Sequence, residues 1–322
     1  MALVPPPFDP ELAAALAVVT EGLPPTVTLE WARQMREQGF GPVLTNEQLA
    51  LDGAFAVEER AAPGPAGDPE VPLLICRPTD EPGPCPVVYY IHGGGMILGD
   101  NRTGLPATLE MAQEIGAVIV SVDYRLAPEH PHPAPVEDVY AGYLWTVEHA
   151  EELGGDPERI IIAGASAGGG LTAALALLAR DRKAQQPLGQ ILLCPMLDDR
   201  NDTPSAQQMA GLGVWDRGSN EVGWGALLGA DRGGPDVSEY AAPARAADLS
   251  GLPPAFIDVG SAETFRDEAV AYASRIWQAG GVAELHVWPG GFHVFDAMAP
   301  QAALSRAATA ARLPWLRRLL GE

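Results

Sequence analysis

The chain has 322 residues, 47% of them apolar, and a formal net charge of −22 from 42 acidic and 20 basic side chains. At about 150 residues per domain, this length fits two domains or one large α/β unit with an addition, and the apolar fraction excludes disorder as the main state. The acidic balance disfavours nucleic acids and anionic membrane surfaces as partners. No run approaches roughly 18 uncharged apolar residues, so we expect no membrane-spanning segment.

The first segment and the cysteines narrow the class further. The opening residues lack a cationic leader, and the apolar stretch 12–19 has acidic neighbours on both sides. We interpret this stretch as part of an amphipathic helix, which predicts a cytoplasmic protein rather than a secreted one. The three cysteines show no C-x-x-C spacing. Neither a disulfide framework nor a zinc site is therefore expected, and we expect no metal and no cofactor.

Short β-rich runs alternate with helix-length segments along most of the chain. This alternation predicts an α/β fold, a mostly parallel eight-stranded sheet with helices on both faces. The runs 87–91 and 160–162 are apolar without alternation, as expected for strands buried on both faces. The predicted strands are 54–60, 73–77, 87–91, 118–122, 160–163, 191–194, 255–259 and 285–288. The predicted helices are 105–115, 136–152, 167–182, 268–278 and 301–320.

Two stretches do not follow the alternation. Residues 1–50 contain two helix-like pieces, 11–19 and 29–38, before any strand, and residues 198–250 contain another near 221–228. Open α/β sheets bind ligands at the carboxyl ends of their strands. We therefore expect both stretches to lie over that edge of the sheet.

A turn rich in small residues follows the predicted strand 160–163. Residues 164–168 read Gly-Ala-Ser-Ala-Gly, which matches the G-x-S-x-G nucleophile elbow and places Ser166 between a strand and a helix. Bulky neighbours would collide with the strand or the helix, and the strained geometry lifts the serine Oγ into a cleft. A Gly/Ala-rich packing turn is the alternative. A phosphate loop is disfavoured because no lysine follows the glycines.

A second turn follows the predicted strand 87–91. Residues 92–95 read His-Gly-Gly-Gly, and consecutive glycines let backbone N–H groups approach a substrate oxygen. Together with the N–H of Ala167 they could hold the oxygen of a tetrahedral intermediate; a flexible loop is the alternative. His92 precedes the nucleophile in the chain, so we expect it to fix the loop rather than to act as the base.

Six histidines are candidates for the general base. His293 stands on a loop just after the final predicted strand, at its carboxyl end, whereas His286 lies inside that strand and is interpreted as a packed or edge residue. The other four precede the nucleophile and are His92, His130, His132 and His149. The chain order serine, acid, histidine makes His293 the predicted base.

The orienting carboxylate should then come between Ser166 and His293. Glu263 occupies the loop after the predicted strand 255–259, where a carboxylate can reach the imidazole. Asp267 is the main alternative, since either acid type serves in such triads. Asp258 lies within the strand, and Glu268 fits the first turn of a helix, where its charge complements the dipole.

Together these residues resemble the hormone-sensitive-lipase-like (bacterial family IV) carboxylesterases of the α/β-hydrolase superfamily. The resemblance spans about residues 54–320 and is carried by segments 92–95, 123–130, 166–169, 252–254, 266–268 and 292–293. It implies nucleophile Ser166, base His293, acid Glu263 by register, oxyanion donors Gly94, Gly95 and Ala167, and no cofactor. Two positions depart from the family pattern: Ala165 replaces the usual acid before the nucleophile, and Glu263 replaces the usual aspartate.

The resemblance also implies a helical cap over the active site. We expect residues 1–50 to form its amino-terminal part and residues 198–245 an insertion, with the hydrolase core at 51–197 and 246–322. Met96, Ile97, Trp215 and Trp224 are candidate walls of an apolar pocket, although each is more often a core residue.

The predicted function is hydrolysis of short- to medium-chain acyl or aryl carboxylic esters through an acyl-enzyme intermediate. The predicted partner is a small-molecule ester, and a homodimer is compatible with the sequence. The alternatives are a non-catalytic ligand-binding relative of the same fold, or a lactonase, amidase or acyltransferase that uses the same triad.

Overall fold

The computed structural model describes residues 3–38, 44–81 and 83–322. Its eight-stranded sheet has the order β1-β2-β4-β3-β5-β6-β7-β8. The pairs β1–β2 and β2–β4 are antiparallel, and the other five neighbouring pairs are parallel. The predicted mostly parallel eight-stranded sheet is confirmed. The strands are β1 (Phe55–Ala62), β2 (Val71–Pro78), β3 (Cys85–Ile91), β4 (Val118–Val122), β5 (Gly155–Ala165), β6 (Gly189–Leu193), β7 (Ala255–Gly260) and β8 (Ala283–Trp288).

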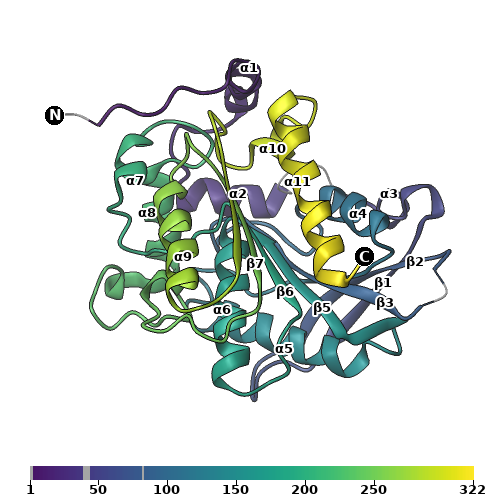
Figure 1. Cartoon of the computed structure of the whole chain (residues 1–322). Helices are drawn as coiled ribbons and strands as arrows, with labels where there is room; N and C mark the ends of the chain where they lie inside the picture. The colour runs from purple at the N-terminus through teal and green to yellow at the C-terminus, as the bar shows by residue number, and fades with distance from the viewer. Residues whose placement is uncertain (1–2, 39–43, 82) are drawn as a thin grey trace.

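Helices cover both faces of the sheet (Figure 1). Val87, Tyr89 and Ile91 of β3 pack into one apolar cluster with helices α5, α6 and α9, whereas Val88 and Tyr90 pack into another with α4 and α11. Alternate side chains of this strand therefore point into two different cores, which is why its sequence is apolar without alternation. The helices are α4 (Leu105–Glu114), α5 (Ala134–His149), α6 (Ala167–Asp181), α9 (Arg266–Gln278) and α11 (Ala303–Leu320).

Three short helices, α3 (Asn46–Leu49), α7 (Pro204–Gln208) and α10 (Phe295–Met298), have no counterpart among the predicted elements. Each has four or five residues, too few to establish a helical hydrophobic period. All eight predicted strands are present. The largest shift at a strand end is at β5, which begins at Gly155 through pairing with Cys85.

The two additions expected outside the alternation contain α1 (Pro10–Val19), α2 (Leu29–Gln38) and α8 (Arg217–Leu228). They contact one another: the backbone N–H of Val27 donates to Ser219 Oγ at 2.8 Å, and Thr26 Oγ1 donates to Asp216 Oδ2 at 3.2 Å. Helix α1 lies beside α10 (Figure 1) and packs Leu12 and Leu16 in one cluster with it. Residues 1–2 and 39–43 of the expected amino-terminal cap lie outside the described residues.

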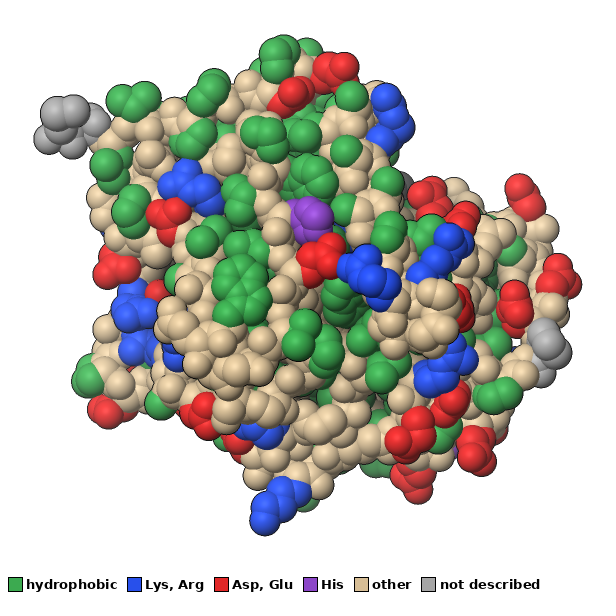
Figure 2. All heavy atoms as spheres, viewed as in Figure 1, with side chains coloured by type: hydrophobic (Ala, Val, Ile, Leu, Met, Phe, Trp, Pro, Cys, Tyr) green, Lys and Arg blue, Asp and Glu red, His purple; other side chains and the backbone are tan. Residues whose placement is uncertain are grey.

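The surface carries charges of both signs. On the face shown in Figure 2, acidic side chains are dispersed, with arginine and lysine side chains among them. Within the described ranges, no helix is both long enough and apolar enough to cross a membrane. The three cysteines are buried and unpaired.

Candidate active site

Ser166 occupies the sharp turn between β5 and α6. Its backbone has φ 58° and ψ −121°, a conformation that is strained for a residue with a side chain. The turn closes because its flanking residues are small: a Cβ at Gly168 would overlap the carbonyl oxygen of Ile91, and one at Gly164 would overlap that of Gly168. The expected strand-turn-helix context of the elbow is therefore present, with Ser166 at its apex.

His293 lies on the loop after β8 and meets this serine. Its Nε2 is 2.9 Å from Ser166 Oγ, although the two residues are 127 positions apart in the sequence. The ring of Phe265 packs edge-to-face against the imidazole of His293, with the two ring centroids 5.1 Å apart. Both Ser166 and His293 are only 5% exposed. In this position the imidazole can accept the proton of the serine hydroxyl.

Glu263 lies on the loop after β7, on the other side of the imidazole. Its Oε1 is 3.4 Å from His293 Nδ1, and its Oε2 accepts the backbone N–H of Gly260 at 3.3 Å. The carboxylate is fully buried. It is placed to orient the ring and to stabilise the imidazolium that forms when the ring accepts a proton.

Asp267, the alternative acid, is engaged elsewhere. Its Oδ2 accepts the backbone N–H of Ser205 at 2.8 Å, and its Oδ1 accepts from Arg266 Nε at 2.8 Å. Position 267 lies in the first turn of α9, and its carboxylate joins that helix to α7 instead of the imidazole. The geometry therefore favours Glu263 over Asp267 as the partner of His293.

Two further buried acids of this region, Asp258 and Glu268, bind partners other than His293. Asp258 Oδ2 accepts from Arg312 Nη2 at 3.1 Å, and burial raises the pKa of Asp258 to about 6 against the lowering effect of that guanidinium. Glu268 Oε1 accepts the backbone N–H of Leu197 at 2.8 Å, and burial raises the pKa of Glu268 well above its ordinary value. These two carboxylates are thus bound to Arg312 and to the backbone of Leu197, whereas the carboxylate that hydrogen-bonds to His293 is that of Glu263.

The glycine loop after β3 abuts the turn that holds Ser166. Gly94 and Gly95 have φ 117° and 62°, which side chains disfavour. A Cβ at Gly93 would come within 2.9 Å of the carbonyl oxygen of Ala165. The loop thus approaches the elbow as closely as backbone permits, and the amino end of α6, which begins at Ala167, faces the same region.

His92 holds this loop from behind. It is fully buried, its Nδ1 is 2.7 Å from the carbonyl oxygen of Gly93, and its ring stacks on Tyr124 at 4.1 Å. The Tyr124 hydroxyl donates to the carbonyl oxygen of His92 at 2.9 Å. Burial lowers the pKa of His92 to about 4, so the ring is neutral at pH 7. These contacts fit the expected positioning role.

Trp215 covers the glycine loop from the insertion. A Cβ at Gly95 would overlap the indole ring. The backbone carbonyl of Trp215 accepts from Thr264 Oγ1 at 2.6 Å, and its Nε1 donates to Asn220 Oδ1 at 3.4 Å. The other three candidate wall residues, Met96, Ile97 and Trp224, are at most 1% exposed and belong to the core cluster.

Cys194 is a neighbour of the site that sequence reasoning missed. Its Sγ, a carboxylate oxygen of Glu263 and a ring nitrogen of His293 all lie within 4.8 Å of one another. The available signal was position: Cys194 directly follows β6, at the carboxyl edge to which β5, β7 and β8 also deliver residues.

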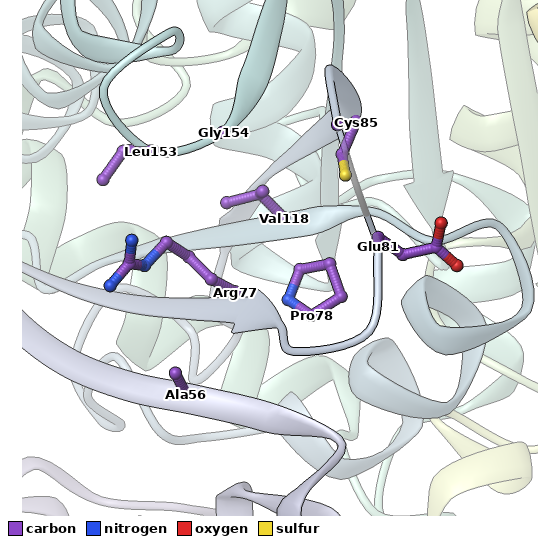
Figure 3. Close-up of a pocket in the computed structure, with 9 residues that line it drawn as sticks. Ala56, Arg77, Pro78, Glu81, Cys85, Val118, Leu153 and Gly154 are labelled. Carbon is purple, nitrogen blue, oxygen red and sulfur yellow. The ribbon is translucent and has the colours of Figure 1, made fainter.

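A cavity of about 290 Å³ lies at the opposite edge of the sheet, near the starts of β3 and β4. Figure 3 shows the side chains of Arg77, Pro78 and Glu81 beside it, with Cys85 at the start of β3. None of its nine lining residues is a serine or a histidine. This cavity is therefore separate from the Ser166–His293 pair.

Comparison with known proteins gives a consistent picture. The profile of the α/β-hydrolase fold matches residues 88–297. Carboxylesterase NlhH of Mycobacterium tuberculosis is 36% identical over 317 residues, which cover 97% of both chains. Human hormone-sensitive lipase is 34% identical over 173 residues, 53% of this chain and 16% of that protein. The structure of a bacterial heroin esterase superposes with a TM-score of 0.88 at 40% identity and covers 97% of this chain and 98% of its own.

Proposed function

The chain belongs to the α/β-hydrolase family, within its hormone-sensitive-lipase-like carboxylesterases, and from this premise we propose that Ser166, His293 and Glu263 form its catalytic triad. The observation that carries the proposal is the 2.9 Å separation between Ser166 Oγ and His293 Nε2. At that distance one tautomer suffices for catalysis: Nε2 accepts the hydroxyl proton while Nδ1–H points at Glu263.

In the acylation step, Ser166 Oγ attacks the ester carbonyl as His293 Nε2 removes its proton. A bond forms between Oγ and the carbonyl carbon, and the C–O bond to the alcohol then breaks. His293 returns the proton to the departing alcohol. Glu263 stabilises the imidazolium that exists between these two transfers, and its burial strengthens this interaction because the surroundings have a low dielectric constant.

Backbone N–H groups of Gly94, Gly95 and Ala167 stabilise the negative charge on the carbonyl oxygen. Support comes from the close approach of the glycine loop to the elbow and from the position of Ala167 at the amino end of α6. That helix end carries a partial positive charge and N–H groups that the helix itself leaves free. Water, activated by His293, then attacks the acyl-enzyme and releases the acid.

We assign the cap to residues 1–50 and 198–245. Val27 hydrogen-bonds to Ser219 of α8, and Thr26 hydrogen-bonds to Asp216, the residue just before that helix. These contacts between the two segments support a single cap domain built from both. The Trp215 ring against Gly95 supports a small acyl site, because it fills the space next to an oxyanion donor. The substrates are therefore short- to medium-chain acyl or aryl esters.

Labelling with a fluorophosphonate probe tests the nucleophile. We expect one equivalent to react with the unmodified enzyme and none with Ser166→Ala, which also loses turnover of p-nitrophenyl acetate. Full esterase activity in Ser166→Ala would remove the proposal. A panel of p-nitrophenyl esters of rising chain length tests the acyl preference. Matched anilides, lactones and acyl acceptors would reveal amidase, lactonase or acyltransferase chemistry at the same serine.

A further inference from the structure

Three neighbouring strands bring a thiol, a carboxylate and an imidazole together. Cys194 follows β6, Glu263 follows β7 and His293 follows β8. The ligand atoms of the three lie within 4.8 Å of one another, and all three residues are at least nine-tenths buried. The cluster uses one cysteine only, so cysteine spacing could not have revealed it.

This set of donors suits a thiophilic divalent cation. Sulfur, imidazole nitrogen and carboxylate oxygen are the ligands that Zn²⁺ and its heavier relative Cd²⁺ prefer, whereas Ca²⁺ and Mg²⁺ prefer oxygen alone. A thiolate and a carboxylate together neutralise a divalent ion, which a buried site requires. Zinc ligands lie about 2.0–2.3 Å from the ion, so closing the cluster needs side-chain shifts of roughly 1 Å.

We propose that Cys194, Glu263 and His293 form a binding site for a thiophilic divalent cation and that filling this site switches off the esterase. The thiol binds as its conjugate base: one bond forms between the cation and Sγ, and the Sγ proton is released to solvent.

The esterase would lose activity because of which nitrogen of the His293 ring binds the cation. His293 Nδ1 is the nitrogen that faces Glu263, so a cation shared with Glu263 takes Nδ1. The imidazole proton then resides on Nε2, and Nε2–H cannot accept the proton of Ser166. This second half of the proposal rests on the proposed triad; the binding half does not.

Binding is measured with Cd²⁺ alone, through the ultraviolet charge-transfer band of a cadmium thiolate. The matched control is Cys85→Ala, which removes another buried thiol at the opposite end of the sheet. We expect the unmodified enzyme and Cys85→Ala to saturate at one equivalent. Cys194→Ala should lose the band and bind at least about tenfold more weakly, as expected when a metal site loses a contributor. Equal titrations of Cys194→Ala and the unmodified enzyme would overturn the proposal.

Inhibition is measured with Zn²⁺ preincubation, and each variant is compared with its own uninhibited rate on p-nitrophenyl acetate. The Zn²⁺ concentration that halves the rate should be similar for the unmodified enzyme and Cys85→Ala. It should be at least about tenfold higher for Cys194→Ala and for the near-isosteric Cys194→Ser. Removal of Zn²⁺ with a chelator should restore activity. Full activity of the Cd²⁺-loaded enzyme would refute the switch. Should Ser166→Ala retain activity, the triad would be wrong, while a Cys194-dependent cadmium band would still support the site.

Discussion

The indole ring of Trp215 lies directly against the Cα of Gly95, so that any side chain at position 95 would overlap the ring. This contact joins the insertion after β6 to the loop after β3, where an oxyanion donor is proposed. Gly95 also has φ 62°, so it is constrained twice, by its neighbour and by its backbone.

Gly95→Ala should therefore displace the loop and move the N–H of residue 95 out of place, which should lower kcat/KM for p-nitrophenyl acetate by about 10²-fold or more, the usual effect of losing one oxyanion donor. Gly211→Ala is the control: φ at Gly211 is 73°, but no atom lies within 4 Å of the added Cβ. It shares the backbone strain without the overlap and should keep most of its activity. Similar losses in both variants would attribute the effect to strain alone.

Trp215→Ala should shift the acyl preference towards longer chains. Removing the ring opens space next to Gly95, and each additional buried methylene of a substrate contributes about 0.8 kcal/mol. We expect the ratio of kcat/KM for p-nitrophenyl octanoate to that for the acetate to rise by about tenfold or more. Trp277→Ala, which removes a 48% exposed tryptophan of α9, is the control. An unchanged ratio would exclude Trp215 from the acyl site.

Glu263→Gln should lower kcat by about 10³-fold or more, because a neutral amide neither fixes the imidazole tautomer nor stabilises the imidazolium. Asp267→Asn removes the negative charge from the pair with Arg266 and should change kcat only a few-fold. Glu263→Asp tests the length of the side chain and should recover part of the activity. A larger loss in Asp267→Asn than in Glu263→Gln would reverse the assignment of the acid.

Arg312→Met should destabilise the fold by about 3–5 kcal/mol, because it leaves the buried carboxylate of Asp258 and the partly buried carboxylate of Asp296 without their cation. Arg312 lowers the pKa of Asp258, so its removal raises that pKa further above the unfolded value. The part of this loss that comes from Asp258 should thus be largest at alkaline pH and fade as the pH falls towards about 6, below which Asp258 is protonated in the folded state of both proteins. Urea unfolding across this pH range measures the loss of stability, and Arg317→Met, at an exposed arginine of α11, is the control.

The buried His92 should make the fold less stable in acid. Its folded pKa is about 4, below the ordinary 6.5, so the unfolded chain binds the proton more readily as the pH falls from 6.5 to 4. The free energy of unfolding should fall by up to about 3 kcal/mol over that range from this group. His92→Asn should show a correspondingly shallower dependence on pH in urea unfolding. Identical slopes in the two proteins would contradict the neutral buried ring.

Much of the fold was predictable because its signals are local. The apolar runs of β3 and β5 and the small residues at 164 and 168 each specify a strand or a turn by themselves. The short helices α3, α7 and α10 were missed because each has four or five residues, and a helical period needs more.

The site was predictable only as a set of candidates. Ser166 and His293 could be chosen from chain order and from their place after a strand, because parallel strands deliver their following loops to one edge. Glu263 was predicted as the acid from its place on the loop and from register, but Asp267 remained its alternative because both acids follow β7 within a few residues. In the structure, Glu263 faces the imidazole, whereas Asp267 lies in the first turn of α9 and accepts the backbone N–H of Ser205.

The amino-acid sequence by itself determined the order of strands and helices along the chain and the glycines that allow the two turns to close. It also identified the serine and the histidine of the site, Ser166 and His293. Only the tertiary structure decided that the Trp215 ring lies on Gly95 and that the Cys194 thiol lies beside Glu263 and His293. The physical reason is that these contacts join loops from different strands. These contacts form only when the strands are arranged in the right order in the sheet, and the residues next to each other along the chain do not indicate that order.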